Sequence, residues 1–79
     1  PGGAKPRWDM DFRRNALEAL TPKEREVAEL VAAGYSTDNI RAHLGVKDST
    51  VRSHIKAIFR KTDTHSRAEL TRFLIGVRA

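Results

Sequence analysis

Apolar residues recur along the chain with the spacing of helices, and no stretch shows the two-residue alternation of a strand. The clearest case lies between residues 49 and 61, where apolar positions follow the i, i+4, i+7, i+8 pattern of a helix with one face on a core. These positions are Val51, Ile55, Ile58 and Phe59. Three further helices are indicated by the apolar sets Val27, Leu30 and Val31; Ile40 and Leu44; and Leu70, Phe73 and Leu74. The pattern predicts an all-α fold of four short helices.

Capping residues locate the ends of these helices. The segments Thr21 to Glu24 and Ser66 to Glu69 each have the form of a capping box, in which a hydroxyl and a glutamate three residues later satisfy backbone donors. Gly34 ends the helix that begins after Thr21, because glycine adopts the left-handed C′ conformation cheaply. The next helix opens at Ser36 and stops before Gly45. A brief turn then leads into the helix at 49–61, so these two helices predict a helix-turn-helix.

The start of the chain has a weaker pattern. The residues that recur four positions apart are Trp8, Phe12, Ala16 and Leu20. They predict a short extra helix, while the opening PGGAKP is typical of a flexible linker or a cloning remnant. We therefore expect a linker with a short helix at 1–19 and one domain at 20–79. We also expect this domain to come from the C-terminal part of a longer protein.

The helix at 49–61 also has a basic face. Arg52, Lys56 and Arg60 follow one another at intervals of four residues, and the segment contains no acid. Like charges at this spacing repel, so the face indicates a polyanionic partner. The net charge of the chain is +5, and residues 41–67 contain seven basic and two acidic residues, so the excess is local. Duplex DNA fits this face, because its major groove admits a helix. A solvated basic face is the alternative.

Composition gives no sign of catalysis or metal binding. The chain has no cysteine, which excludes disulfides and thiolate metal sites. Its three histidines, His43, His54 and His65, are eleven residues apart, so no pair has the i, i+4 spacing of two ligands on one helix turn. No glycine-rich phosphate loop is present. We expect no enzyme activity, no catalytic residues, no metal and no cofactor. Without an apolar run that could span a bilayer or a signal-peptide pattern, we expect a cytoplasmic protein that does not bind membranes.

From Leu20 to about Phe73 the chain resembles the LuxR/FixJ/NarL-type DNA-binding domain of bacterial transcriptional regulators. Three segments carry the likeness, in the same order and without insertion: LTPKEREVAELVAAGYSTDNIRAHLGV, STVRSHIKAIFRK and SRAEL. The resemblance implies a four-helix domain in a response regulator or LuxR-type protein, with the recognition helix at about 49–61 in the major groove of double-stranded DNA.

The resemblance also implies roles for individual residues. Arg52, Ser53 and Lys56 would face base edges. Residues expected nearer the phosphates are Ser49, Thr50, Arg60 and Lys61, and Lys47 completes the expected DNA-binding set. The fourth helix would join two copies as a homodimer on DNA through Leu70, Phe73 and Leu74, and RNA polymerase would be a further partner.

Some positions depart from the family pattern. Lys47 stands where a Ser or Thr usually caps the recognition helix, so we expect Asp48 or Ser49 to act as the cap instead. Thr62 and Thr64 stand where aliphatic residues usually fill the core, so we expect buried hydroxyls that need partners, and a gap left by the smaller side chains.

Two other functions stay open at this stage. A promoter-reading domain of a sigma factor shares the first three helices, but it lacks a fourth helix opened by a segment like Ser66 to Glu69. A protein-binding module could instead dock an acidic partner on the basic face. A steep dependence of binding on salt concentration, which counterion release from DNA produces, would distinguish DNA from such a partner.

Overall fold

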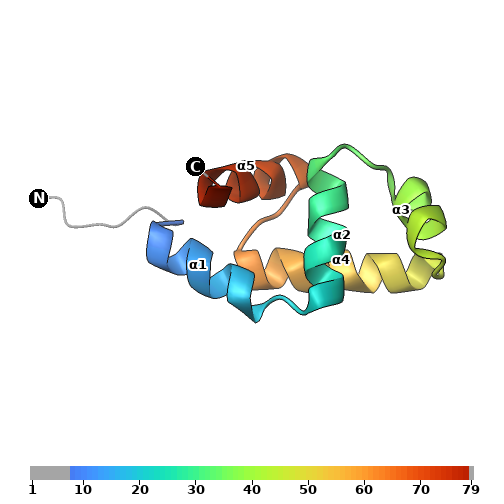
Figure 1. Cartoon of the computed structure of the whole chain (residues 1–79), viewed down its shortest axis with the longest axis horizontal. Coiled ribbons are helices and arrows are strands. Elements are labelled where there is room, and N and C mark those ends of the chain that lie inside the picture. Colours follow the sequence, from blue (N-terminus) through green and yellow to red (C-terminus); the bar gives the residue numbers. More distant parts are fainter. Residues whose placement is uncertain (1–7, 79) are drawn as a thin grey trace, which may run out of the picture.

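The computed structural model describes residues 8–78, and these form five α-helices without a strand in this range. The helices are α1 (Met10–Ala19), α2 (Pro22–Ala32), α3 (Thr37–Leu44), α4 (Asp48–Thr62) and α5 (Arg67–Arg78). The predictions of an all-α fold, of four helices and of a short extra helix are confirmed. The expected linker PGGAKP lies outside the described residues. Figure 1 shows α4 along the long axis of the molecule, with α2 across it, α3 near its start, and α1 and α5 near its end.

The predicted capping residues open α2, α3 and α5. Thr21 Oγ1 accepts a hydrogen bond from Glu24 N at 3.1 Å, and Glu24 Oε1 accepts one from Thr21 N at 3.0 Å, which completes a capping box. Ser66 Oγ accepts from Glu69 N at 3.1 Å, but the Glu69 carboxylate reaches one residue further back, to His65 N at 2.8 Å. The second box is therefore extended by one residue.

The start of α4 has no side-chain cap, and the prediction that Asp48 or Ser49 replaces it is wrong. The N-cap is Lys47, whose side chain makes no capping hydrogen bond. Asp48 and Ser49 already lie in the first helical turn, past the position from which a side chain can cap. Asp48 Oδ2 instead pairs with Arg52 Nε at 2.7 Å. A carboxylate in the first turn still interacts favourably with the helix dipole.

One hydrophobic core joins all five helices. Its fully buried members lie on α2 (Val27, Ala28), α3 (Ile40), α4 (Val51, Ile58) and α5 (Leu70, Phe73). The first helix, α1, contributes Ala16 to the same cluster. Because α1 precedes the expected domain boundary after residue 19, part of the expected linker segment packs as one unit with the four predicted helices.

The apolar side of α5 faces this core, and the prediction that Leu70, Phe73 and Leu74 present a surface to a partner is wrong. The three side chains are at most 2% exposed. The physical reason is packing inside the monomer, where α5 lies against α2 and α1. The rings of Trp8, just before α1, and of Phe12 on α1 pack edge-on against Phe73, with centroids 5.8 and 6.4 Å apart. These three side chains are therefore covered within the monomer.

Buried hydroxyls in the connection between α4 and α5 find partners in each other. Thr62 Oγ1 donates to Ile58 O at 2.8 Å and lies 2.8 Å from Thr64 Oγ1. Within the described residues no buried side-chain nitrogen or oxygen lacks a hydrogen-bond partner. The expected need of these hydroxyls for partners is therefore met. Asp63 between them adopts the left-handed conformation, with φ of 53°.

Polar contacts hold α1 against α5. Arg13 Nη1 on α1 donates to Phe73 O on α5 at 2.6 Å. A second bond, from Trp8 Nε1 just before α1 to Asp63 O at 3.2 Å, reaches the residue that follows α4. The Arg13 guanidinium passes so close to Gly76 that a Cβ there would collide with it. Glycine at this position therefore gives the guanidinium room to reach the carbonyl of the preceding turn.

Candidate nucleic-acid interface

One side of α4 is buried and the opposite side is open and basic. Val51 and Ile58 are fully buried against the core. The exposed residues on the other side are Ser49, Arg52, Ser53, Lys56 and Arg60. We call these five residues the α4 face. Of the other predicted contacts, Lys47 is exposed just before the helix and Thr50 is half-buried.

The first cation of the α4 face is oriented by its own helix. Arg52 Nε binds Asp48 Oδ2 at 2.7 Å, and the Arg52 side chain is 75% exposed. An exposed i, i+4 ion pair stabilises a helix by only about 0.3–0.5 kcal/mol. Arg52 can therefore exchange Asp48 for a stronger acceptor, such as a guanine edge or a phosphate, at small cost.

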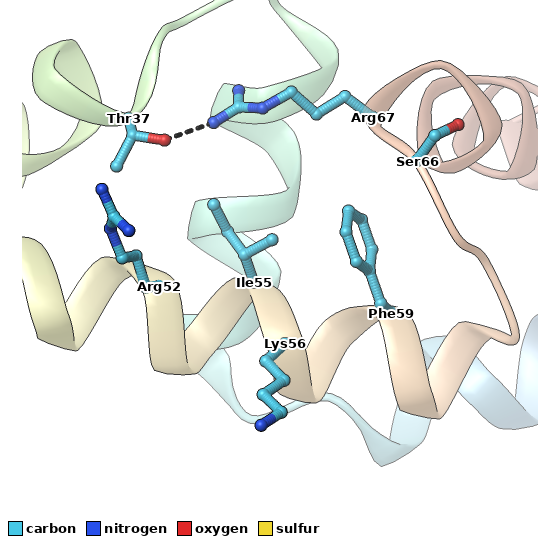
Figure 2. A pocket seen from close by; sticks show the side chains of 7 residues that line it. All are labelled: Thr37, Arg52, Ile55, Lys56, Phe59, Ser66 and Arg67. Carbon is cyan, nitrogen blue, oxygen red and sulfur yellow. Dashed lines mark hydrogen bonds between the residues drawn. The ribbon is translucent and has the colours of Figure 1, made fainter.

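Beside the α4 face lies an open groove of about 420 Å³, between α3, α4 and the start of α5. Its lining residues are Thr37, Arg52, Ile55, Lys56, Phe59, Ser66 and Arg67. Figure 2 shows Ile55 and Phe59 rising from α4 into this space, while Lys56 points away from it. The groove thus has an apolar floor with Arg52 at its edge, while Lys56 lines it without directing its amine into it.

Arg67 crosses the far side of this groove, and the sequence interpretation missed its role. Its guanidinium donates to Tyr35 O at 2.8 Å and to Thr37 Oγ1 at 2.5 Å (Figure 2). These bonds tie the first turn of α5 to the turn between α2 and α3. In the sequence Arg67 only follows the predicted cap Ser66. Its partners are about thirty residues away, so no local pattern indicates them.

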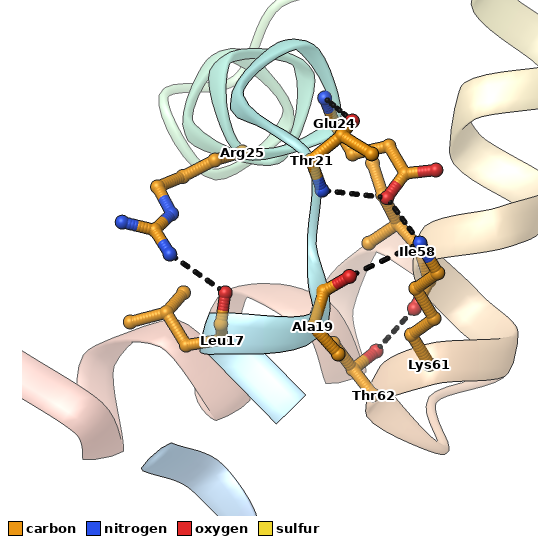
Figure 3. A network of polar contacts seen from close by, with 8 residues as sticks. All are labelled: Leu17, Ala19, Thr21, Glu24, Arg25, Ile58, Lys61 and Thr62. Atoms are coloured by element: carbon orange, nitrogen blue, oxygen red, sulfur yellow. Dashed lines mark hydrogen bonds and ion pairs between the residues drawn. The ribbon is translucent and has the colours of Figure 1, made fainter. Parts of the chain in front are cut away.

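Lys61, expected nearer the phosphates, binds groups of its own domain and does not belong to the α4 face. Its amine donates to Glu24 Oε1 at 2.7 Å and to Ala19 O at 3.1 Å, as Figure 3 shows, and its side chain is 26% exposed. Lys61 follows Arg60 by one residue, about 100° around the helix. That rotation takes its side chain off the α4 face and towards the start of α2, where the Glu24 carboxylate binds it.

The pKa of Glu24 is lowered by these contacts. The largest cause is the hydrogen bond from the Lys61 amine, followed by the bond from the Thr21 backbone amide. Burial acts in the opposite direction, because it penalises the charged carboxylate. Glu24 therefore stays ionised and keeps Lys61 bound at neutral pH.

Two of the three histidines make contacts within the domain. The ring of His43 lies edge-on to Tyr35 at 5.7 Å, and His65 Nε2 lies 3.8 Å from Asp63 Oδ1. Among residues 8–78 no group of three or more potential metal-ligating side chains comes together. In the same part of the chain, no helix has the length and apolar character needed to cross a membrane.

Comparisons with known proteins fit this architecture. Residues 18–74 match the model of a family described as bacterial regulatory proteins, luxR family. The chain is 44% identical over 60 residues to the transcriptional regulatory protein DesR of Bacillus subtilis, covering 76% of this chain and 30% of DesR. It is 39% identical over 57 residues to a nitrate/nitrite response regulator protein homolog of Haemophilus influenzae, covering 72% and 27%.

The nitrate/nitrite response regulator protein NarL of Escherichia coli is 38% identical over 53 residues, which cover 67% of this chain and 24% of NarL. The chain thus spans less than a third of the length of each of these relatives. No solved structure matches it. The family is one of DNA-binding regulatory domains and not a class of enzymes. With five helices in place and the match covering residues 18–74, the chain belongs to the luxR family of bacterial regulatory proteins.

Proposed function

We propose that this domain reads a specific sequence in double-stranded DNA as the C-terminal output domain of a cytoplasmic bacterial transcriptional regulator, with α4 in the major groove. The observation that carries the proposal is the α4 face, an exposed basic surface on a helix whose opposite side is fixed in the core. A helix held in this way can place side chains against base edges reproducibly.

Within the α4 face the residues take different roles. Arg52, Ser53 and Lys56 contact base edges, since Arg can bind guanine through two hydrogen bonds. Arg60 is exposed and lies two turns beyond Arg52. At that position α4 leaves the major groove of the DNA, so Arg60 contacts a phosphate. The other phosphate contacts are Ser49, Thr50 and Lys47. Lys61 is left out of this set because Glu24 holds it.

The proposal includes a homodimer on DNA, with two α4 helices about one DNA turn apart. The α5 residues first expected at its interface are buried, but Ile75 on the same helix is 58% exposed. One isoleucine contributes about 1.5–3 kcal/mol when fully buried. That amount suits a contact formed between copies already bound to neighbouring half-sites. Ile75→Glu should lower cooperative binding to a two-site operator and leave binding to a single half-site unchanged.

Two variants test the DNA-reading proposal after a random-site selection has supplied the operator. Arg52→Ala should lower affinity for the operator by about 1–3 kcal/mol and relax the preference at one base position. Arg60→Ala should weaken binding to operator and scrambled duplex alike. It should also make the log–log salt slope shallower by roughly 0.9, because one phosphate contact is lost. If Arg52→Ala kept the full preference for the operator, α4 would not read bases through this face.

A further inference from the structure

At the end of α4 one amine meets the ends of two other helices. Lys61 Nζ lies 2.7 Å from Glu24 Oε1 in the first turn of α2 and 3.1 Å from Ala19 O at the last residue of α1 (Figure 3). We call Lys61, Glu24, Thr21 and Ala19 the Lys61 cluster. It joins α1, α2 and α4 at a single point.

The carboxylate in this cluster has little freedom to move. Glu24 is 7% exposed, and the oxygen that binds Lys61 also accepts the Thr21 backbone N–H at 3.0 Å. Turning the carboxylate away would break both the ion pair and the capping box. The amine of Lys61 is therefore fixed relative to the start of α2.

The end of α1 depends on cations from other helices. The last turn of α1 has no basic residue of its own. Its carbonyl groups are bound from outside, Leu17 O by Arg25 Nη2 at 2.8 Å and Ala19 O by Lys61. Cations at a helix C-terminus interact favourably with the helix dipole. Lys61 thus contributes to docking α1 as well as to holding α4.

We propose that Lys61 is a positioning residue, which sets the angle of α4 against α1 and α2 and so the alignment of Arg52 and Lys56 with the bases; this inference rests on the proposed function. Lys61 lies nine residues from Arg52, or about 14 Å along the helix axis. A tilt of about 5° at Lys61 moves Arg52 by roughly 1 Å over this length. Hydrogen bonds to base edges weaken steeply when their distance and angle depart from the optimum.

The test compares Lys61→Met with Lys23→Met, a matched control on the exposed side of α2. Methionine keeps the length of the side chain and removes the charge. Lys61→Met should lower the preference for operator over scrambled duplex about ten-fold, the equivalent of roughly one base contact. Its salt slope should equal that of the unchanged protein, because no phosphate contact is lost. Lys23→Met should change neither quantity.

A second readout needs no DNA. Trp8, the one tryptophan of the chain, donates to Asp63 O just after α4 and packs on Phe73. If Lys61 docks α1, Lys61→Met should make Trp8 about two-fold more accessible to a soluble quencher while the helical circular dichroism is retained. Glu24→Gln keeps an acceptor for the capping box and removes the charge. Glu24→Gln should raise the accessibility of Trp8 to the quencher by a smaller factor. If Lys61→Met does not fold, Glu24→Gln is the variant that tests whether the ion pair docks α1.

Several results would overturn the inference. A salt slope shallower by roughly 0.9, with equal losses on both duplexes, would make Lys61 a phosphate ligand. A lower melting temperature with unchanged operator preference and Trp8 quenching would reduce Lys61 to a stabilising contact. Failure of the unchanged protein to prefer the selected operator is a separate result. It contradicts the proposed function, while Trp8 quenching still decides whether Lys61 holds α1 against α4.

Discussion

The two ends of α4 use their basic residues in opposite ways. Near the start, Arg52 pairs with Asp48 on its own helix, and 75% of its side chain is exposed. Near the end, Lys61 is 26% exposed and binds groups from α1 and α2. Both residues belong to one basic segment of the sequence, yet one is available to a ligand and the other holds the fold. The role of each cation is therefore decided by the residues that pack next to it in the fold, and not by its position in the basic segment of the sequence.

The largest expected effect is on stability, and it tests the packing of α5 against α1 near the end of α4. Phe73→Ala should destabilise the domain by about 3–5 kcal/mol, because it removes a fully buried ring on which Trp8 and Phe12 pack. Ile75→Ala on the same helix should cost less than about 1 kcal/mol, since Ile75 is 58% exposed. Urea denaturation measures both. Similar losses for the two variants would contradict the packing of α5 against α1.

The next effect concerns the stability of the domain at low pH. The hydrogen bond from Lys61 lowers the pKa of Glu24 in the folded state. A lowered folded pKa means that the stabilisation is fully present above the ordinary glutamate pKa of about 4.3 and is lost as the pH falls through the folded value. The loss arises because protonation of Glu24 weakens its bonds with the Lys61 amine and the Thr21 backbone N–H. Melting temperatures across this range should fall less for Glu24→Gln, and identical pH profiles would show that the pair contributes nothing.

The capping hydroxyl of the Lys61 cluster should matter less. Thr21→Ala removes the acceptor for Glu24 N and should cost about 1 kcal/mol. Ser66→Ala removes the matching acceptor at the start of α5 and should cost a similar amount. Thermal unfolding reports both changes, with Lys23→Ala as a surface control. A melting curve unchanged by Thr21→Ala would mean that α2 does not depend on this cap.

The smallest expected effect concerns the exposed pair of Asp48 and Arg52 near the start of α4. Asp48→Asn breaks the exposed pair with Arg52 and should change stability by no more than about 0.5–1 kcal/mol, including the weaker interaction with the helix dipole. It should raise affinity for any duplex, because it frees Arg52 and removes an acid beside the DNA. If DNA affinity fell instead, Asp48 would be needed to orient Arg52 for its contact.

Local patterns were sufficient to predict the helices. Periodicity gave the buried side of α4, and the caps at Thr21, Ser36 and Ser66 gave three helix starts. These features depend on residues within four positions of one another, so a single sequence contains them. The exposure of Arg52, Ser53, Lys56 and Arg60 follows from the same periodicity, whereas their contacts with DNA stay predictions.

The errors arose where distant residues decide the outcome. Leu70, Phe73 and Leu74 were assigned to a partner because the resemblance implies dimerisation through the fourth helix, and the sequence did not show that the core buries all three. Lys61 was placed near the phosphates by the family resemblance, which does not show that Glu24, 37 residues away in sequence, lies 2.7 Å from its amine. The capping pattern did mark Glu24 as an acid fixed near a helix start, but not which cation lies beside it.

The paired hydroxyls of Thr62 and Thr64 constrain how this connection can change over evolutionary time. Thr62 gives its one hydroxyl proton to Ile58 O, so Thr64 must be the donor in the bond between the two threonines. Thr62→Val would leave that buried donor without an acceptor, whereas Thr64→Val leaves the bond to Ile58 intact. Replacing both by valine would be close to neutral. A lineage moving between hydroxyl and aliphatic pairs would therefore pass more readily through a form that keeps threonine at position 62.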